Sequence, residues 1–244
     1  MKLAPVSVII PAFNAAGLIG EAIDTVLQQT RRPQQIIVVD DGSTDATHSV
    51  VAKFPEASYL VQGNSGAAQA RNLGARYVAS PFMCFLDADD LWPSDRIERL
   101  LSCLETDPML DIVCGSMVQF QRDRDGKMVE LSKPLACHLP SVMLMRTDVF
   151  RMVGPFSGKW RVGETIEWVS RAVDAGVRRG SIADVVLLRR VHEQNLGKVV
   201  SASSHEYLQM LREVMVRRRG HPNFNGGQSD VNGATETPQS EAER

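Results

Sequence analysis

Short apolar runs alternate with longer amphipathic stretches along the first hundred residues of the chain. The runs 6–10, 36–39 and 82–86 are almost entirely apolar, as in strands that are covered on both faces of a parallel sheet. Between them, residues 17–29 and 66–78 repeat apolar side chains at the spacing of one helical face. This alternation predicts a doubly wound α/β fold with right-handed crossovers.

The same patterns predict the elements of the rest of the chain. Further helices are expected from Ser43 or Thr44 to about 54, from Ser94 to about 104, from 147 to a stop at Gly154, and at 164–175 and 201–219. Further strands are expected at 58–62, 111–121, 128–131, 141–145 and 182–188. The predicted organisation is one domain over residues 1–200, an amphipathic helix over 201–220 and a disordered tail over 221–244, where large apolar side chains nearly vanish.

Composition narrows the class of protein. The chain has 244 residues, a net charge of −2, and 43% hydrophobic against 23% charged residues, so nothing in it favours nucleic acid as a partner. The four cysteines lack C-x-x-C spacing, and three lie in apolar segments, which favours reduced thiols. The first residues do not resemble a signal peptide, and no apolar run is long enough for a membrane span. We therefore expect a cytoplasmic protein.

Three carboxylates follow the buried run 82–86 at once: Asp87, Asp89 and Asp90. In an open α/β sheet the ligand crevice lies outside the carboxyl ends of the strands, which is where these acids are expected. Carboxylate oxygens suit Mg²⁺ or Mn²⁺, which reach substrate phosphates through only one or two protein ligands. The alternative is a solvated, Asp-rich turn.

Four motifs occur in order along the chain. They are residues 8–14 (VIIPAFN), 39–45 (VDDGSTD), 64–74 (NSGAAQARNLG) and 85–90 (FLDADD). Together they resemble the nucleotide-sugar-binding half of a family 2 glycosyltransferase with the GT-A fold, over roughly residues 5–200. Each motif is weak alone.

The resemblance implies a donor site built from the loops after the first strands. The loop from Pro11 through Ala12 to Asn14 would surround the nucleobase and ribose, and Asp41 would bond the base edge. Asp40 would be structural.

The later motifs add phosphate contacts. Gly66 would let the backbone approach the ligand, while Arg71 and Asn72 would hold ribose or pyrophosphate near a helix N-terminus. The segment 189–195 resembles the family's R-x-H-x-x-N, in which His192 would meet the metal or the pyrophosphate. Ordinary structural roles, such as a surface ion pair for Arg71, are the alternatives.

Asp87 and Asp89 match the family's D-x-D, whose role is to hold Mn²⁺ or Mg²⁺ against the diphosphate. Asp89 is the better candidate for direct metal contact, with Asp87 toward ribose or a water ligand. Asp90 is expected to cap the following turn.

The resemblance also implies an inverting transfer in which a carboxylate takes the acceptor proton. The family carries this carboxylate as the Asp of a Glu-Asp pair that opens a late helix, and here Thr165 occupies that position. Glu164 and Glu167 are therefore the candidate catalytic bases, with Glu164 favoured. The alternative is that both are acids stabilised by the helix dipole.

The predicted function is a metal-dependent glycosyltransferase that moves a sugar from a nucleoside-diphosphate sugar to a hydroxyl acceptor, in polysaccharide or surface-glycan assembly. A UDP-sugar is the favoured donor. A catalytically impaired donor-binding or scaffold relative is the alternative, because of Thr165. A nucleotidyltransferase would need a cation at 11–17, and a dinucleotide oxidoreductase would need G-x-G-x-x-G after the first strand; neither is present.

Three aromatic or apolar features leave alternatives open. Trp160 and Trp168 are either core residues or part of the acceptor site. The helix at 201–219 ends in Arg217 to Arg219, so its apolar face either packs on the domain or contacts an anionic membrane peripherally.

Overall fold

The computed structural model describes residues 3–160, 163–192 and 204–219. The strands are β1 (Ala4–Ala12), β2 (Pro33–Asp40), β3 (Ala57–Val61), β4 (Phe82–Phe85), β5 (Ile112–Arg122), β6 (Met128–Glu130), β7 (Leu135–Ala136), β8 (Met143–Arg146) and β9 (Arg179–Arg190). The helices are α1 (Ile19–Leu27), α2 (Thr47–Val51), α3 (Ala67–Arg76), α4 (Arg96–Thr106), the 3₁₀ turn η1 (Pro140–Val142), α5 (Thr147–Val153), α6 (Glu164–Asp174) and α8 (Ser204–Arg219). The predicted α/β class is confirmed.

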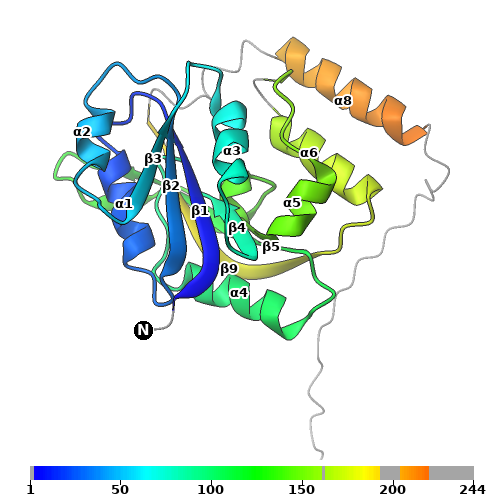
Figure 1. Cartoon of the computed structure of the whole chain (residues 1–244), viewed down its shortest axis with the longest axis horizontal. Helices are drawn as coiled ribbons and strands as arrows, with labels where there is room; N and C mark the ends of the chain where they lie inside the picture. The colour runs from blue at the N-terminus through cyan, green and yellow to red at the C-terminus, as the bar shows by residue number, and fades with distance from the viewer. Residues whose placement is uncertain (1–2, 161–162, 193–203, 220–244) are drawn as a thin grey trace, which may run out of the picture.

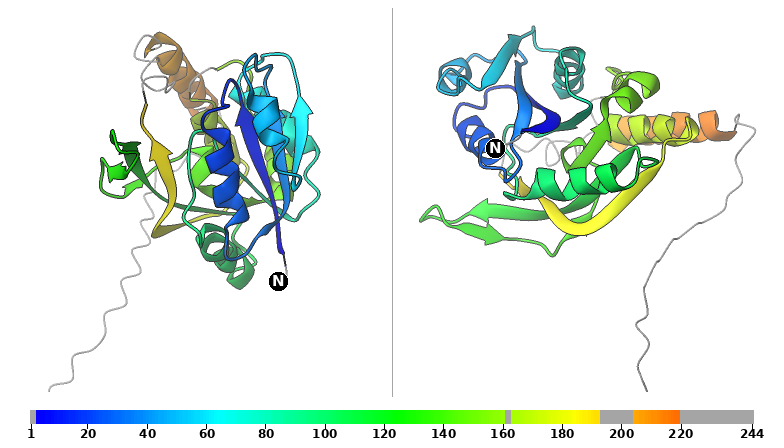
Figure 2. Two further views of the ribbon diagram at one scale, coloured as in Figure 1. Left: turned by 90° about the vertical axis from the view of Figure 1, so that its left-hand side faces the viewer. Right: turned by 60° about the horizontal axis from the view of Figure 1, so that its bottom comes forward.

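One mixed sheet forms the centre of the fold (Figures 1 and 2). Its order is β3-β2-β1-β4-β8-β5-β6, and β7 and β9 also pair with β5. Strands β1 to β4 are mutually parallel, whereas β8 runs antiparallel to both β4 and β5. Parallel strands end at one edge of a sheet, so the segments that follow β1, β2, β3 and β4 emerge at the same edge. The four motifs therefore meet there.

Helix α3 packs closely on one face of the sheet, and this packing determines where its first turn lies relative to the edge. In Figure 1, α1 and α2 lie on one side of β1 and β2, and α3 lies on the other. Gly74 of α3 sits directly against Ile9 and Val39, where a Cβ would clash with the Ile9 side chain. A glycine is therefore needed for α3 to lie close enough to the sheet for its first turn to reach the edge.

The amides at the starts of α2 and α4 are bonded to residues other than the predicted caps. The amide of Thr47 at the start of α2 donates to the Asp45 carboxylate at 2.9 Å, not to Ser43 or Thr44. The amide of Ile97 in α4 donates to the side chain of Gln29, 68 residues away, at 2.9 Å. Sequence spacing identifies only local caps, so the second contact is not visible in it.

The predicted strands are confirmed with altered bounds in the second half. The hairpin of β5 and β6 forms, pairing Phe120 with Glu130. Strand β9 is longer than predicted, and β7 and η1 come between β6 and β8 without a sequence signal. All four cysteines are free thiols.

Helix α8 packs beside α6 (Figure 1). Trp160, Met210 and Val214 form a small buried cluster between them. Trp168 is fully buried and donates its indole N–H to the Gly154 carbonyl at 2.8 Å. Both tryptophans are thus core residues, and Trp168 does not line an acceptor site. Within the described residues, no helix is both long and apolar enough to cross a membrane.

Candidate active site

Strand β4 ends at the candidate site. Asp87 and Asp89 keep 31% of their side-chain surface exposed, whereas Asp90 is 3% exposed. The Asp90 carboxylate accepts the Arg190 amide N–H at 2.9 Å, so Asp90 ties β4 to the end of β9 and does not cap the next turn as predicted. The pKa of Asp90 is raised well above its ordinary value, mainly because the carboxyl group is buried and also because Asp89 and Asp87 carry the same charge nearby.

Arg71 connects two elements across the site. Its guanidinium donates to Asp87 at 2.6 Å and to Glu164, the first residue of α6, at 3.2 Å. Burial opposes the charge of Arg71, but the two carboxylates outweigh it and raise its pKa. The Asp87 carboxylate also accepts the hydroxyl of Ser141 at 3.1 Å. Asp87 and Glu164, 77 positions apart, are therefore held by one cation.

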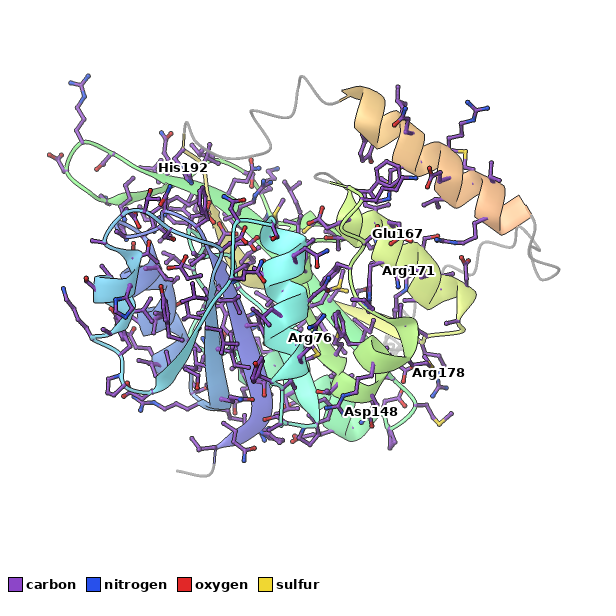
Figure 3. The ribbon with its side chains drawn as sticks, turned by 45° about the horizontal axis from the view of Figure 1, so that its top comes forward. Arg76, Asp148, Glu167, Arg171, Arg178 and His192 are labelled. Atoms are coloured by element: carbon purple, nitrogen blue, oxygen red, sulfur yellow. The ribbon has the colours of Figure 1, made fainter. Side chains whose placement is uncertain are left out.

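The two candidate bases have different surroundings. Glu164 faces Arg71 and keeps 17% of its side chain exposed. Glu167 is 8% exposed and accepts hydrogen bonds from Arg171 at 3.0 Å and from Arg217 of α8 at 2.9 Å. In Figure 3, Glu167 lies under α8, well apart from His192. The structure thus brings Glu164 to the D-x-D and leaves Glu167 as an anchor for α8.

His192 and Asp89 form a contact between the two halves of the chain. The Nε2 atom of His192 lies 2.9 Å from the Asp89 carboxylate. Arg190 donates from Nε to the Asp89 carbonyl at 2.9 Å and from its terminal nitrogen to Glu21 of α1 at 2.6 Å. The end of β9 therefore holds both the backbone and the side chain of Asp89.

This pair fits a divalent metal whose remaining ligands are phosphate and water. No group of three His, Cys, Asp or Glu side chains suited to a metal occurs within residues 3–160, 163–192 and 204–219. One carboxylate and one imidazole are too few to hold an ion alone, but Mg²⁺ and Mn²⁺ bind through few protein ligands when a diphosphate supplies others.

The loop after β1 begins later than predicted. Pro11 and Ala12 lie within β1, paired with Val39 and Asp40, and the Ala12 carbonyl accepts the Asp41 amide at 2.8 Å. Their backbone groups are thus used by the sheet and are not free in a loop.

Asn14 is the residue at which the chain turns away from the sheet. Its φ of 49° is left-handed, and its side chain accepts the Thr44 amide at 2.8 Å. The preceding Phe13 is 48% exposed at this edge. Sequence reasoning missed Phe13, although a large apolar residue beside a sharp turn was the available signal.

Asp41 organises the loop before α3. Its carboxylate accepts the amides of Ser65 at 2.8 Å and Gly66 at 2.7 Å, and the side chain of Gln62 at 2.7 Å. Gly66 has a φ of 90°, which few other residues adopt. These donors take three of the four acceptor positions of the carboxylate, and Asp41 is 4% exposed. Asp40 is internal: it accepts the Ser43 amide and the Tyr59 hydroxyl.

The side chain of Asn72 is directed into the protein. Its amide nitrogen donates to the Phe156 carbonyl, and its oxygen accepts the Phe156 amide, both at 2.8 Å. This reciprocal pair fixes the segment before α6 against α3. Both groups of the Asn72 side-chain amide are thus bonded to Phe156, and, contrary to the prediction, they are not directed toward a ribose or pyrophosphate.

The fold and site define an α/β protein whose sheet edge carries acidic side chains bridged by a buried arginine. The model of the glycosyl transferase family 2 matches residues 7–181, and the chain belongs to this family. The fold is the GT-A fold of family 2 glycosyltransferases.

One sequence relative and two solved structures show the extent of the similarity. The chain is 36% identical over 102 residues to an Escherichia coli protein named UDP-Glc:alpha-D-GlcNAc-diphosphoundecaprenol beta-1,3-glucosyltransferase, covering 41% of this chain and 40% of that one. TarS of S. aureus, solved with UDP, matches with a TM-score of 0.70 at 19% identity over 91% of this chain and 67% of that chain. A mannosyltransferase of Pyrobaculum calidifontis, solved with GDP-Man and Mn²⁺, gives 0.65 at 20% identity over 88% and 65%. In five curated relatives the aligned stretch covers 17% to 56% of the relative's own length.

Proposed function

We propose that the chain is a metal-dependent glycosyltransferase that moves a sugar from a nucleoside-diphosphate sugar, with UDP favoured, to an acceptor hydroxyl with inversion. The observation that carries the proposal is the Arg71 guanidinium, which pairs with both Asp87 of the D-x-D and Glu164 of α6 and so brings the two carboxylates together. Family membership supports the reaction class, and the UDP complex of TarS supports the nucleotide. The name of the E. coli relative supports surface-glycan assembly on a lipid-linked acceptor.

The donor is proposed to lie along the edge formed by β1, β2 and β4. Phe13 offers an exposed ring for the base to stack on, and Asp41 retains one acceptor position for a base N–H. The backbone at Gly66, at the N-terminus of α3, and the Arg71 guanidinium favour the diphosphate.

Asp89 and His192 are proposed to hold Mn²⁺ or Mg²⁺, with Asp87 toward ribose or a water ligand. When bound, such an ion neutralises negative charge on the leaving diphosphate. The Mn²⁺ in the P. calidifontis structure supports a divalent metal in this fold.

Glu164 is proposed as the base. The acceptor oxygen bonds to the anomeric carbon as the bond from that carbon to the diphosphate oxygen breaks. The electron pair leaves with the nucleoside diphosphate, and the acceptor proton passes to the Glu164 carboxylate. Arg71 donates to Oε1 of Glu164, and no donor in the described part of the chain contacts Oε2. The Oε2 atom is therefore the better suited to accept the acceptor's proton. Glu167, enclosed by Arg171 and Arg217, is assigned no catalytic step.

The first experiment is a thermal-shift panel of UDP-, GDP- and dTDP-sugars with and without Mn²⁺. A donor at a hundred times its dissociation constant stabilises the fold by about 2.7 kcal/mol. For a protein of this size, we expect a rise in Tm of roughly 5–10 °C. This rise should occur with one nucleotide only, require the metal, and be lost in Asp89→Asn. The matched control is Asp148→Asn, whose side chain is 91% exposed and distant from the site in Figure 3. No shift with any donor would contradict the proposal.

The alternative is a donor-binding relative that does not catalyse transfer. It is favoured by Thr165, which is 6% exposed and stands where the family has its base. Donor hydrolysis or transfer separates the two functions. On the proposed function, Glu164→Gln keeps the donor-dependent shift and loses turnover. On the alternative, the unmodified protein already binds the donor without turnover.

A further inference from the structure

Helix α8 carries apolar side chains on two opposite faces. The inner face consists of Tyr207, Met210 and Val214, which pack on Trp160 and α6. Arg217 continues this face, donating to Glu167 at 2.9 Å and to Asp174 at 3.1 Å. Packing on the domain therefore accounts for one face of α8 only.

The outer face is formed by Leu208, Met215 and Val216. They are 62%, 56% and 62% exposed, although each is a large apolar residue. Leu208 and Met215 are seven residues apart and so lie two turns apart on one side of the helix, with Val216 beside them. Such a group of exposed apolar side chains on one helix face indicates a surface that contacts something apolar.

The charge on this face is positive. Arg212 lies between Leu208 and Met215 on the same side of the helix and is exposed. It forms no ion pair within the part of the chain that the structure describes. The acid next to it, Glu213, is already paired with Lys159. An interfacial helix combines an apolar stripe with cations of this kind, because the apolar groups enter the acyl boundary while the cations meet anionic headgroups.

We propose that the outer face of α8 docks on the surface of an anionic lipid bilayer. Arg212 supplies the charge complementarity, and Leu208, Met215 and Val216 supply the insertion. The residues that follow α8 in sequence are a poor alternative cover, because among residues 221–244 only Phe224 and Val231 are large and apolar.

Helix α8 reaches the start of α6 through its inner face. Met210 and Tyr207 lie against Gly163, where a Cβ would collide with the Met210 methyl group, and Gly163 directly precedes Glu164. Docking of the outer face would therefore leave α8 as the layer between the lipid surface and the helix that begins with Glu164. This arrangement would suit a lipid-linked acceptor, and that point rests on the proposed function. The docking surface itself does not depend on the proposed function.

The test is co-sedimentation of the full chain with vesicles, without donor or metal. Vesicles containing phosphatidylglycerol are compared with pure phosphatidylcholine vesicles. We expect the protein to bind the anionic vesicles, with an affinity that falls as salt is raised. A combined variant, Leu208→Ser with Met215→Ser and Val216→Ser, should bind at least about tenfold more weakly, because its apolar insertion is lost. Arg212→Ser should lower affinity and reduce the dependence on salt.

The matched control changes two exposed apolar residues elsewhere, Val129→Ser with Leu131→Ser, which should leave vesicle binding unchanged. Thermal unfolding shows whether each variant retains its fold. Equal vesicle binding by the triple variant, or no binding by the unmodified chain, would overturn the proposal. Light scattering that shows a dimer in the unmodified chain and a monomer in the triple variant would instead make a second copy the occupant. Failure of this test leaves donor binding untouched, so it is distinct from failure of the proposed function.

Discussion

At the scale of single residues, the site depends on one buried cation. Arg71 is shared between Asp87 and Glu164, which come from β4 and α6. A buried charge is costly unless it is paired, so removing either side of such an arrangement is more damaging than losing a surface ion pair.

Arg71→Met is expected to lower the free energy of unfolding by about 3 kcal/mol, near the lower end for a broken buried pair because Asp87 is partly exposed. Donor affinity should fall as well, because the diphosphate loses its cation. Denaturant unfolding and donor titration measure the two effects. The control Arg31→Met breaks the exposed pair with Glu105 and should cost less than about 1 kcal/mol. Equal effects of the two changes would refute the role of Arg71.

Ser141 is a site residue that the sequence did not indicate. It is fully buried, and its hydroxyl donates to Asp87. The buried guanidinium of Arg96 holds the turn in place by donating to the carbonyls of Ser141 and Met143, at 3.0 and 3.1 Å.

Ser141→Ala is expected to weaken donor binding about tenfold, because a hydrogen bond to a charged group is worth about 1.5–3 kcal/mol and orients Asp87. Calorimetric donor titration measures the change. Ser102→Ala, which removes a hydroxyl bonded to the Glu98 carbonyl on the exposed face of α4, serves as the control. Unchanged donor affinity in Ser141→Ala would show that Asp87 needs no second donor.

At the scale of elements, helix starts bring the loops of the site together. Asp45 accepts the amide of Thr47 at the start of α2 and the amide of Ala16 after β1, at 2.9 and 3.0 Å. Asp45 is exposed, and the slight desolvation by its neighbours opposes the charge, but hydrogen bonds from the Thr47 hydroxyl and from backbone amides prevail and lower the pKa of Asp45. One carboxylate thus links the loops that follow β1 and β2.

Asp45→Ala is expected to lower stability at neutral pH by about 1 kcal/mol, as for loss of a helix-capping carboxylate. Because the folded-state pKa is below the unfolded value, this stabilisation is present above the unfolded pKa of about 3.9 and is lost as pH falls through the folded pKa. Unfolding curves of both proteins should therefore converge in acid. A difference that grows on acidification would contradict the sign.

At the scale of the whole molecule, the site lies where the parallel part of the sheet meets the part that contains antiparallel pairs. The parallel strands β1 to β4 carry the donor motifs, while β8, β5 and β9 carry the elements that complete them. The contacts of Glu164 with Arg71, of Arg190 with Asp90 and of His192 with Asp89 cross this junction.

Binding of donor and metal is therefore expected to protect amides on both sides of the junction from hydrogen exchange. Protection should rise at 87–90, at the start of α6 and at 190–192, because the ligand contacts side chains from all three segments. Mass spectrometry with and without donor tests this. Protection confined to residues before 92 would mean that the later segments do not take part.

The local patterns were sufficient for the first half of the fold. Short apolar runs predicted β1, β2 and β4, and the parallel arrangement then placed residues 13–16, 41–46 and 87–90 at one edge. Pro11 and Ala12 were misplaced because a proline ending an apolar run reads as a strand stop, whereas pairing with β2 keeps both residues in β1.

The sequence by itself determined the alternation of strands and helices, because buried parallel strands read as continuous apolar runs and helices as a 3.6-residue spacing. It also determined the four motifs that resemble the family, and parallel connectivity then predicted the edge at which they meet. Only the tertiary structure decided that Glu164 faces Arg71 while Glu167 anchors α8, since both residues begin one helix and differ only in what packs against them. It alone paired His192 with Asp89, 103 positions apart, and left the outer face of α8 exposed. These contacts depend on how distant segments pack, and spacing along the chain carries no record of that.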